Sequence, residues 1–141
     1  MNMPEIAVQL MNAISEQNWA ALEELCAEDM QAEWVGSFTL KGRPAFVRLY
    51  RYEQAKCYSD FRSEVVERLV HDDERMCFIG RVSGTQTGPI VTHNNEYPAT
   101  GRGFSAEFLC YLKADKGKII KIVYGYNPSA IFAQLGHVSP L

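Results

Sequence analysis

Two tyrosines near the end of the sequence are the first candidates for chemistry. In the stretch GKIIKIVYGYN, residues 117–127, side chains alternate between two sets, which predicts a β-strand. One face of that strand carries Ile120, Ile122, Tyr124 and Tyr126. A phenol with a pKa of about 10 can donate a hydrogen bond to a carbonyl or a developing enolate without losing its proton. If this face lines a hollow interior, Tyr124 and Tyr126 are its candidate hydroxyl donors.

Three further side chains are suited to binding or proton transfer, and each also has a purely structural interpretation. Trp34 offers a flat face for stacking an aromatic ligand, although tryptophan also fills cores. Cys110 could be a nucleophile only if a nearby cation or histidine lowered its thiol pKa; otherwise it is a buried, inert thiol. His93 lies in the polar segment THNNEYP, where it could act from a lid or remain solvated. No catalytic residue is assigned on this basis.

The strand that follows Arg102 decides where its single carboxylate points. Its odd positions include Glu107, whereas its even positions are uniformly apolar: Phe104, Ala106, Phe108, Cys110 and Leu112. The apolar face is expected to face the helices, which leaves Glu107 on the outer face, paired with a partner subunit or with Lys121. The opposite assignment would make Glu107 the prime general base. The face on which the odd positions of this strand lie therefore decides between two interpretations. Either the protein is an enzyme with a carboxylate in its pocket, or its pocket has no carboxylate.

Helices come first along the chain and strands follow. Apolar residues at helical spacing predict helices over 6–14 and 22–26, and Pro44 can begin a third helix that runs through Tyr50 towards Cys57. Strands are predicted over residues 30–36, 61–70, 75–86, 103–113 and 117–127. This order predicts an α+β domain with helices packed on one face of a curved antiparallel sheet.

Two segments outside this regular pattern matter for the site. The connection from Thr87 to Gly101 is polar and longer than the about 4–6 residues typical of compact domains, so we expect it at the mouth of a cavity. Asn127 and Pro128 can cap and begin a final short helix that ends at Gly136.

Composition narrows the possible partners and the compartment. The 141 residues, 47% of them hydrophobic, fit one domain over 1–141. Fourteen basic and 17 acidic residues are evenly spread, which argues against nucleic acid or an anionic membrane as partner, and no apolar run reaches the about 18 residues of a membrane span.

The N-terminus reads as an amphipathic helix rather than a signal peptide, and four widely separated cysteines predict a reduced, cytoplasmic protein. Isolated histidines predict no metal site, and the glycine spacing predicts no phosphate or nucleotide cofactor.

Four stretches together resemble the SnoaL-like branch of the nuclear transport factor two-like superfamily, which includes polyketide cyclases. They are NWAALEELCAEDMQAEWVG, GRVSGTQTGP, PATGRGFSAEFLCYLKADKGKII and NPSAIFAQLG, in the family's order. The resemblance implies a cone-shaped α+β barrel in which a curved antiparallel sheet wraps on three N-terminal helices, with a short C-terminal helix and an apolar pocket open at one end.

The same resemblance implies that the family's catalytic side chains are missing. The cyclases' histidine and aspartate fall on Cys110 and Tyr124, and the proton-shuttling aspartate of the related ketosteroid isomerases falls on Trp34. The helix-one tyrosine of those isomerases falls near Leu10. The resemblance therefore supports the fold and the pocket more than it supports catalysis.

Two functions remain open from the sequence. The first is a cofactor-free pocket protein that binds a small, largely apolar or aromatic carbonyl compound in a cavity without ionised side chains. Its expected ligand-binding residues are Trp34, Tyr50, Phe108, Cys110, Tyr124, Tyr126 and His93. The second is a cofactor-independent polyketide cyclase, isomerase or hydratase that uses the pocket tyrosines. A homodimer is expected through the outer sheet face, where four residues alternate outward: Leu109, Tyr111, Ile119 and Val123.

Overall fold

The helices and strands of the computed structural model follow the predicted order. The structure describes residues 1–137, so the last four residues of the expected domain lie outside the described part. The elements are α1 (Met3–Ser15), α2 (Trp19–Leu25), β1 (Cys26–Trp34), β2 (Phe38–Lys41), α3 (Arg43–Arg48), η1 (Leu49–Gln54), α4 (Ala55–Cys57), β3 (Arg62–His71), β4 (Arg75–Thr85), β5 (Ile90–Val91), β6 (Glu96–Tyr97), β7 (Gly103–Asp115), β8 (Lys118–Gly125) and α5 (Pro128–Leu135). The α+β fold class is confirmed, and β2 and the short β5–β6 pair are additions to it.

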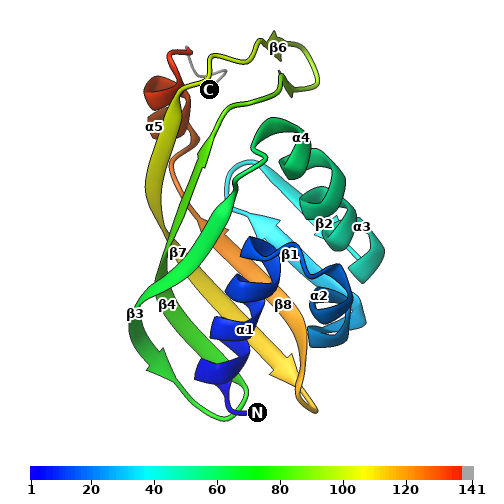
Figure 1. Ribbon diagram of the computed structural model, residues 1–141. Coiled ribbons are helices and arrows are strands. Elements are labelled where there is room, and N and C mark those ends of the chain that lie inside the picture. Colours follow the sequence, from blue (N-terminus) through cyan, green and yellow to red (C-terminus); the bar gives the residue numbers. More distant parts are fainter. Residues whose placement is uncertain (138–141) are drawn as a thin grey trace.

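One curved sheet forms the wall of the molecule. Its strand order is β2-β1-β8-β7-β4-β3, and neighbours are antiparallel except for the parallel pair β1–β8. The sheet curves around α1, α2 and α3, which lie on its concave side, and α5 lies beside the far end of β7 (Figure 1). Within residues 1–137 β2 and β3 remain the two edges, so the expected cone is an open, curved sheet.

The first helix shows how the sequence fixes the concave side. The Asn2 side chain accepts a hydrogen bond from the Glu5 amide at 2.9 Å, which caps the helix start. Ile6, Leu10 and Ile14 repeat on one face and are buried, as the helical spacing predicts. This buried face packs against the sheet and closes one side of the core. No helix within residues 1–137 is both long enough and apolar enough to cross a membrane.

The side chains of β7 alternate between buried and exposed as predicted, with the even positions buried. Phe108 and Cys110 on the even face are 5% and 3% exposed, whereas Leu109 between them is 57% exposed. Glu107 is exposed on the outer face, where its carboxylate lies 3.4 Å from the Arg81 guanidinium. The prediction that Glu107 pairs with Lys121 was therefore wrong, whereas the prediction that Glu107 points outward was right.

The face assigned to the first half of β8 was wrong. Ile119, expected outside, is fully buried, and Ile120, expected inside, is only half-buried. The cause is a shift in pairing: Lys113 is opposite Lys121, whereas Ala114 is opposite Ile119. Ile120 is thus the extra residue of a β-bulge, which reverses the alternation on its N-terminal side. From Ile122 onward the predicted face holds.

Candidate functional site

A cavity of about 1160 Å³ lies between the concave face of the sheet and the helical segment α3–η1–α4. Side chains from β1, β2, β7, β8 and α5 complete its wall. Its volume slightly exceeds the range of about 300–1000 Å³ that is usual for small-molecule sites. The cavity is therefore large enough to hold a small organic molecule of two or more rings.

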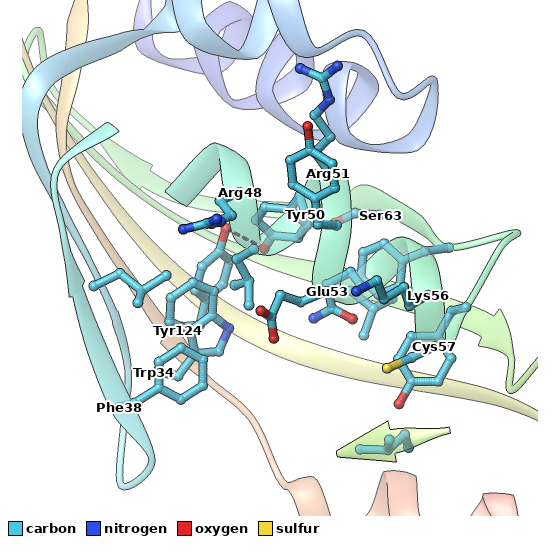
Figure 2. A pocket seen from close by; sticks show the side chains of 18 of the residues that line it. Trp34, Phe38, Arg48, Tyr50, Arg51, Glu53, Lys56, Cys57, Ser63 and Tyr124 are labelled. Atoms are coloured by element: carbon cyan, nitrogen blue, oxygen red, sulfur yellow. Dashed lines mark hydrogen bonds between the residues drawn. The ribbon is translucent and has the colours of Figure 1, made fainter. Parts of the chain in front are cut away.

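Aromatic rings form a continuous stack at one end of this cavity. The Trp34 ring centroid lies 4.6 Å from that of Phe38 and 4.9 Å from that of Tyr124, both nearly parallel to it. Phe108 meets Tyr124 edge-on at 5.7 Å. Figure 2 shows Trp34 between Phe38 and Tyr124, so both of its faces are covered and only its edge is available to a ligand. The predicted stacking on a free Trp34 face does not fit this arrangement.

Two phenol hydroxyls meet beside the aromatic stack. Tyr50 donates a hydrogen bond to the Tyr124 oxygen at 3.0 Å, and both residues line the cavity while being 6% and 5% exposed (Figure 2). Burial is the main reason why the pKa of each phenol lies above its usual value, so both remain protonated at neutral pH. One of the two protons is used between them, which leaves one O–H free to donate to a ligand.

The helix that carries Tyr50 is not regular. Residues Leu49–Gln54 form a π-helical turn between α3 and α4; such turns occur mostly as local bulges inside α-helices and are frequent at functional sites. This turn places Tyr50 against the sheet, opposite Tyr124 on β8. The pair therefore depends on a helix and a strand that lie 74 residues apart in sequence.

Five of the seven predicted ligand-binding residues line the cavity, and two do not. The five are Trp34, Tyr50, Phe108, Tyr124 and Tyr126. Cys110 lies in the core behind the wall, where burial raises the pKa of its thiol, so it behaves as an inert thiol. His93 is exposed in the tip between β5 and β6, away from the lining residues of that loop. Placing these two in the pocket was wrong.

The prediction of a cavity without ionised side chains was wrong at its mouth. Glu53 and Lys56 both line the cavity, and Figure 2 shows both side chains directed towards its open part. Within residues 1–137 neither forms an ion pair, and both are exposed. Glu53 follows Tyr50 by three residues, a spacing that puts helical side chains close together, so the sequence did contain a signal for it. Glu23, Arg48 and Arg51 line the cavity as well, so its wall combines aromatic and charged side chains.

The long loop after β4 lies against the cavity, as predicted, because Pro89, Ile90 and Val91 line it. The amides of Thr87 and Gly88 donate to the Cys57 carbonyl at 2.9 and 3.2 Å, which ties the loop to the end of α4. A Cβ on Gly88 would collide with the Lys56 carbonyl oxygen, so only glycine permits this contact.

A buried amide holds the other side of the same loop. Gln86 is fully buried, and its Nε2 donates to the carbonyls of Gly88, Tyr97 and Pro98, each at 3.1 Å. Its Oε1 lies 2.8 Å from the His137 ring nitrogen, beyond the end of α5. These contacts fix both ends of the loop beside the cavity.

A family model, the SnoaL-like domain, matches residues 7–122 of the chain. The chain belongs to the SnoaL-like family. No sequence among the curated proteins is significantly similar to it.

Solved structures share this SnoaL-like architecture at low sequence identity. A protein with a ketosteroid isomerase-like fold from Catenulispora acidiphila DSM 44928, in complex with trimethylamine, superposes with a TM-score of 0.77 at 18% identity, over 95% of this chain and 94% of its own. A candidate SnoaL-like polyketide cyclase from Jannaschia sp. CCS1 gives 0.79 at 12%, over 94% and 90%. IdmH, a candidate polyketide cyclase from Streptomyces antibioticus, gives 0.77 at 20%, over 94% and 97%. At these identities the likeness establishes the SnoaL-like fold alone.

Proposed function

We propose that this SnoaL-like chain binds a small, largely apolar or aromatic compound through its carbonyl group, without transforming it. The observation that carries the proposal is the hydrogen-bonded Tyr50–Tyr124 pair, set in an aromatic wall at the inner end of the cavity. The free O–H of the pair can donate to a carbonyl oxygen, and the surrounding rings favour an apolar body. Neutral phenols make this recognition independent of pH near neutrality.

The neighbours of the pair favour binding over catalysis. Cys110 and Tyr124, onto which the resemblance carries the cyclases' histidine and aspartate, are direct partners across β7 and β8. Neither is a base at neutral pH, because burial raises the pKa of both. General acid–base catalysis contributes about a hundred- to ten-thousandfold in rate, so a cavity whose inner end lacks a base loses that factor.

A cofactor-independent cyclase, isomerase or hydratase is the second candidate, and one observation favours it. Glu53 is exposed and faces the same cavity as the tyrosine pair, without an ion-pair partner among residues 1–137. In that case Glu53 would remove the proton and the Tyr50–Tyr124 pair would hold the developing oxyanion. Turnover that is lost in Glu53→Gln and retained in Glu107→Gln would favour this second candidate.

Matched ligands test the proposed carbonyl contact. We expect 2-acetonaphthone to bind more tightly than 2-ethylnaphthalene, which keeps the ring system and a two-carbon substituent but lacks the carbonyl oxygen. One hydrogen bond of about 0.5–1.5 kcal/mol corresponds to a preference of roughly two- to tenfold in Kd, measured by calorimetry. Tyr50→Phe combined with Tyr124→Phe removes both hydroxyls and should remove that preference, whereas Tyr111→Phe on the outer sheet face should retain it. The same preference at pH 5 and pH 8 is expected.

Equal affinity of the two naphthalenes for the wild-type protein would contradict the carbonyl contact. Native mass spectrometry of the purified protein adds an independent check, because a stoichiometric bound compound would reveal the ligand class directly. The cytoplasmic location stays a prediction that this proposal does not need.

A further inference from the structure

A third phenol in the cavity has a hydroxyl that the protein does not use. Tyr58 lines the cavity and is 9% exposed, and within residues 1–137 its hydroxyl makes no hydrogen bond. Every fully buried side-chain oxygen or nitrogen among these residues has a partner, so the unpaired Tyr58 hydroxyl is one that remains accessible. Because Tyr58 lines the cavity, a bound molecule can supply the partner that the protein does not.

The Tyr58 ring is held rigidly in one position. It packs on Phe104 with centroids 5.0 Å apart and on Phe61 at 6.1 Å. Its amide donates to the Gln54 carbonyl at 2.8 Å, and its carbonyl accepts from the Phe61 amide at 3.3 Å. Gly84 on β4 leaves the space for this close packing, since a Cβ there would lie 3.2 Å from that of Tyr58. A phenol fixed in this way binds with little loss of side-chain entropy.

Tyr58 and the Tyr50–Tyr124 pair lie at different ends of the cavity. Tyr58 belongs to a separate hydrophobic cluster with Phe104 and Leu135, whereas Tyr50 and Tyr124 belong to the main core. The Phe61 ring contacts both groups, 6.1 Å from Tyr50 and 6.1 Å from Tyr58. Figure 2 likewise shows Cys57, the residue before Tyr58, on the far side of the hollow from Tyr124.

We propose that Tyr58 is a second hydrogen-bonding position, and that the cavity selects elongated aromatic ligands with an oxygen function at each end. One oxygen would accept from the Tyr50–Tyr124 pair, and a hydroxyl at the opposite end would pair with Tyr58. The flat body between them would lie along the cavity wall past Phe61. This inference rests on the proposed function, because it extends the same ligand to a second contact.

The second contact is tested by comparing two ligands on the wild-type protein and on two variants. The probes are 2-acetonaphthone and 6-hydroxy-2-acetonaphthone, which carries a hydroxyl at the end opposite the carbonyl, and calorimetry at about pH 6 keeps the phenols protonated. We expect the added hydroxyl to tighten binding to the wild-type protein about two- to tenfold, which is the value of one hydrogen bond. In Tyr58→Phe this gain should fall below about twofold, while the affinity for 2-acetonaphthone stays the same. Tyr111→Phe is the matched control and should keep the gain.

The outcomes separate the two proposals. A gain that survives in Tyr58→Phe, or no gain in the wild-type protein, would overturn the role of Tyr58 while leaving the carbonyl contact intact. A wild-type protein that does not distinguish 2-acetonaphthone from 2-ethylnaphthalene would instead overturn the proposed function. Unchanged thermal unfolding of Tyr58→Phe confirms that the variant is folded, because phenylalanine keeps the ring that packs on Phe104.

Discussion

Buried thiols and phenols keep the interior of this molecule neutral. Burial raises the pKa of the Cys26 thiol to about 12, and it raises the pKa of Cys110, Tyr50 and Tyr124 as well. Each of these groups is a weaker acid in the folded chain than in the unfolded chain. The neutral form that suits carbonyl binding is therefore also the form that the fold stabilises.

A loss of stability in alkali follows from these shifts. Since the folded pKa is raised, the stabilisation is complete below the ordinary values of 9.0 for thiols and 10.0 for phenols. Above these ordinary pKa values the unfolded chain loses protons before the folded chain does. The free energy of unfolding should therefore fall by about 1.4 kcal/mol per pH unit for each group. Urea unfolding at pH 8, 10 and 11 measures this slope. Tyr124→Phe should have a shallower decline than the wild-type protein, and a slope common to both would contradict the explanation.

At the scale of elements, the loop between β4 and β7 should depend on one glycine. Gly88→Ala forces a Cβ against the Lys56 carbonyl, so we expect the loop to separate from α4 and the protein to lose about 1–3 kcal/mol of stability. Faster hydrogen exchange across residues 87–101 and weaker binding of 2-acetonaphthone would follow. Gly103→Ala is the control, because a Cβ there makes only an ordinary contact with the Gly84 carbonyl. Equal exchange in the two variants would contradict a role for Gly88.

Local sequence patterns were enough to predict most of the elements, although β2 and the β5–β6 pair were missed. Helical spacing located α1, alternation located β7, and Asn127 and Gly136 bound α5 as expected: the Asn127 side chain accepts from the Ser129 amide, and Gly136 has a φ of 87°. Each of these signals acts within one element, where the chemistry of neighbouring residues decides the conformation.

These local patterns could not predict how the elements pair with one another. The bulge at Ile120 arises from the register of β8 against β7, which neither strand specifies alone. Both Tyr50 and Tyr124 were expected in the site, but the contact between their hydroxyls depends on the π-helical turn. Likewise, β2 brings Phe38 over the face of Trp34 that had been expected to be free.

At the scale of the whole molecule, the outer face of the sheet carries an apolar patch. The pairing of β4 with β7 places Ile79 beside Leu109 and Cys77 beside Tyr111. The pairing of β7 with β8 places Tyr111 beside Val123. Leu109 is the most exposed of the five, and the other four are half-buried by their neighbours. Ile119, once expected in this patch, faces the core instead. The Glu64–Arg81–Glu107 ion pairs lie on β3, β4 and β7, two of which also carry the patch.

We expect this patch to be the interface of a homodimer. An apolar face next to paired charges can meet its own copy across a two-fold axis, and a stable interface needs about 800 Å² from each partner. Sedimentation equilibrium at tens of micromolar should give twice the chain mass. Leu109→Glu should shift the protein towards monomer, since two-fold symmetry would bury a carboxylate from each copy without a partner. Val35→Glu, at a residue 52% exposed in the turn after β1, should leave the mass unchanged. A wild-type monomer, or a Leu109→Glu dimer, would place the interface elsewhere or remove it.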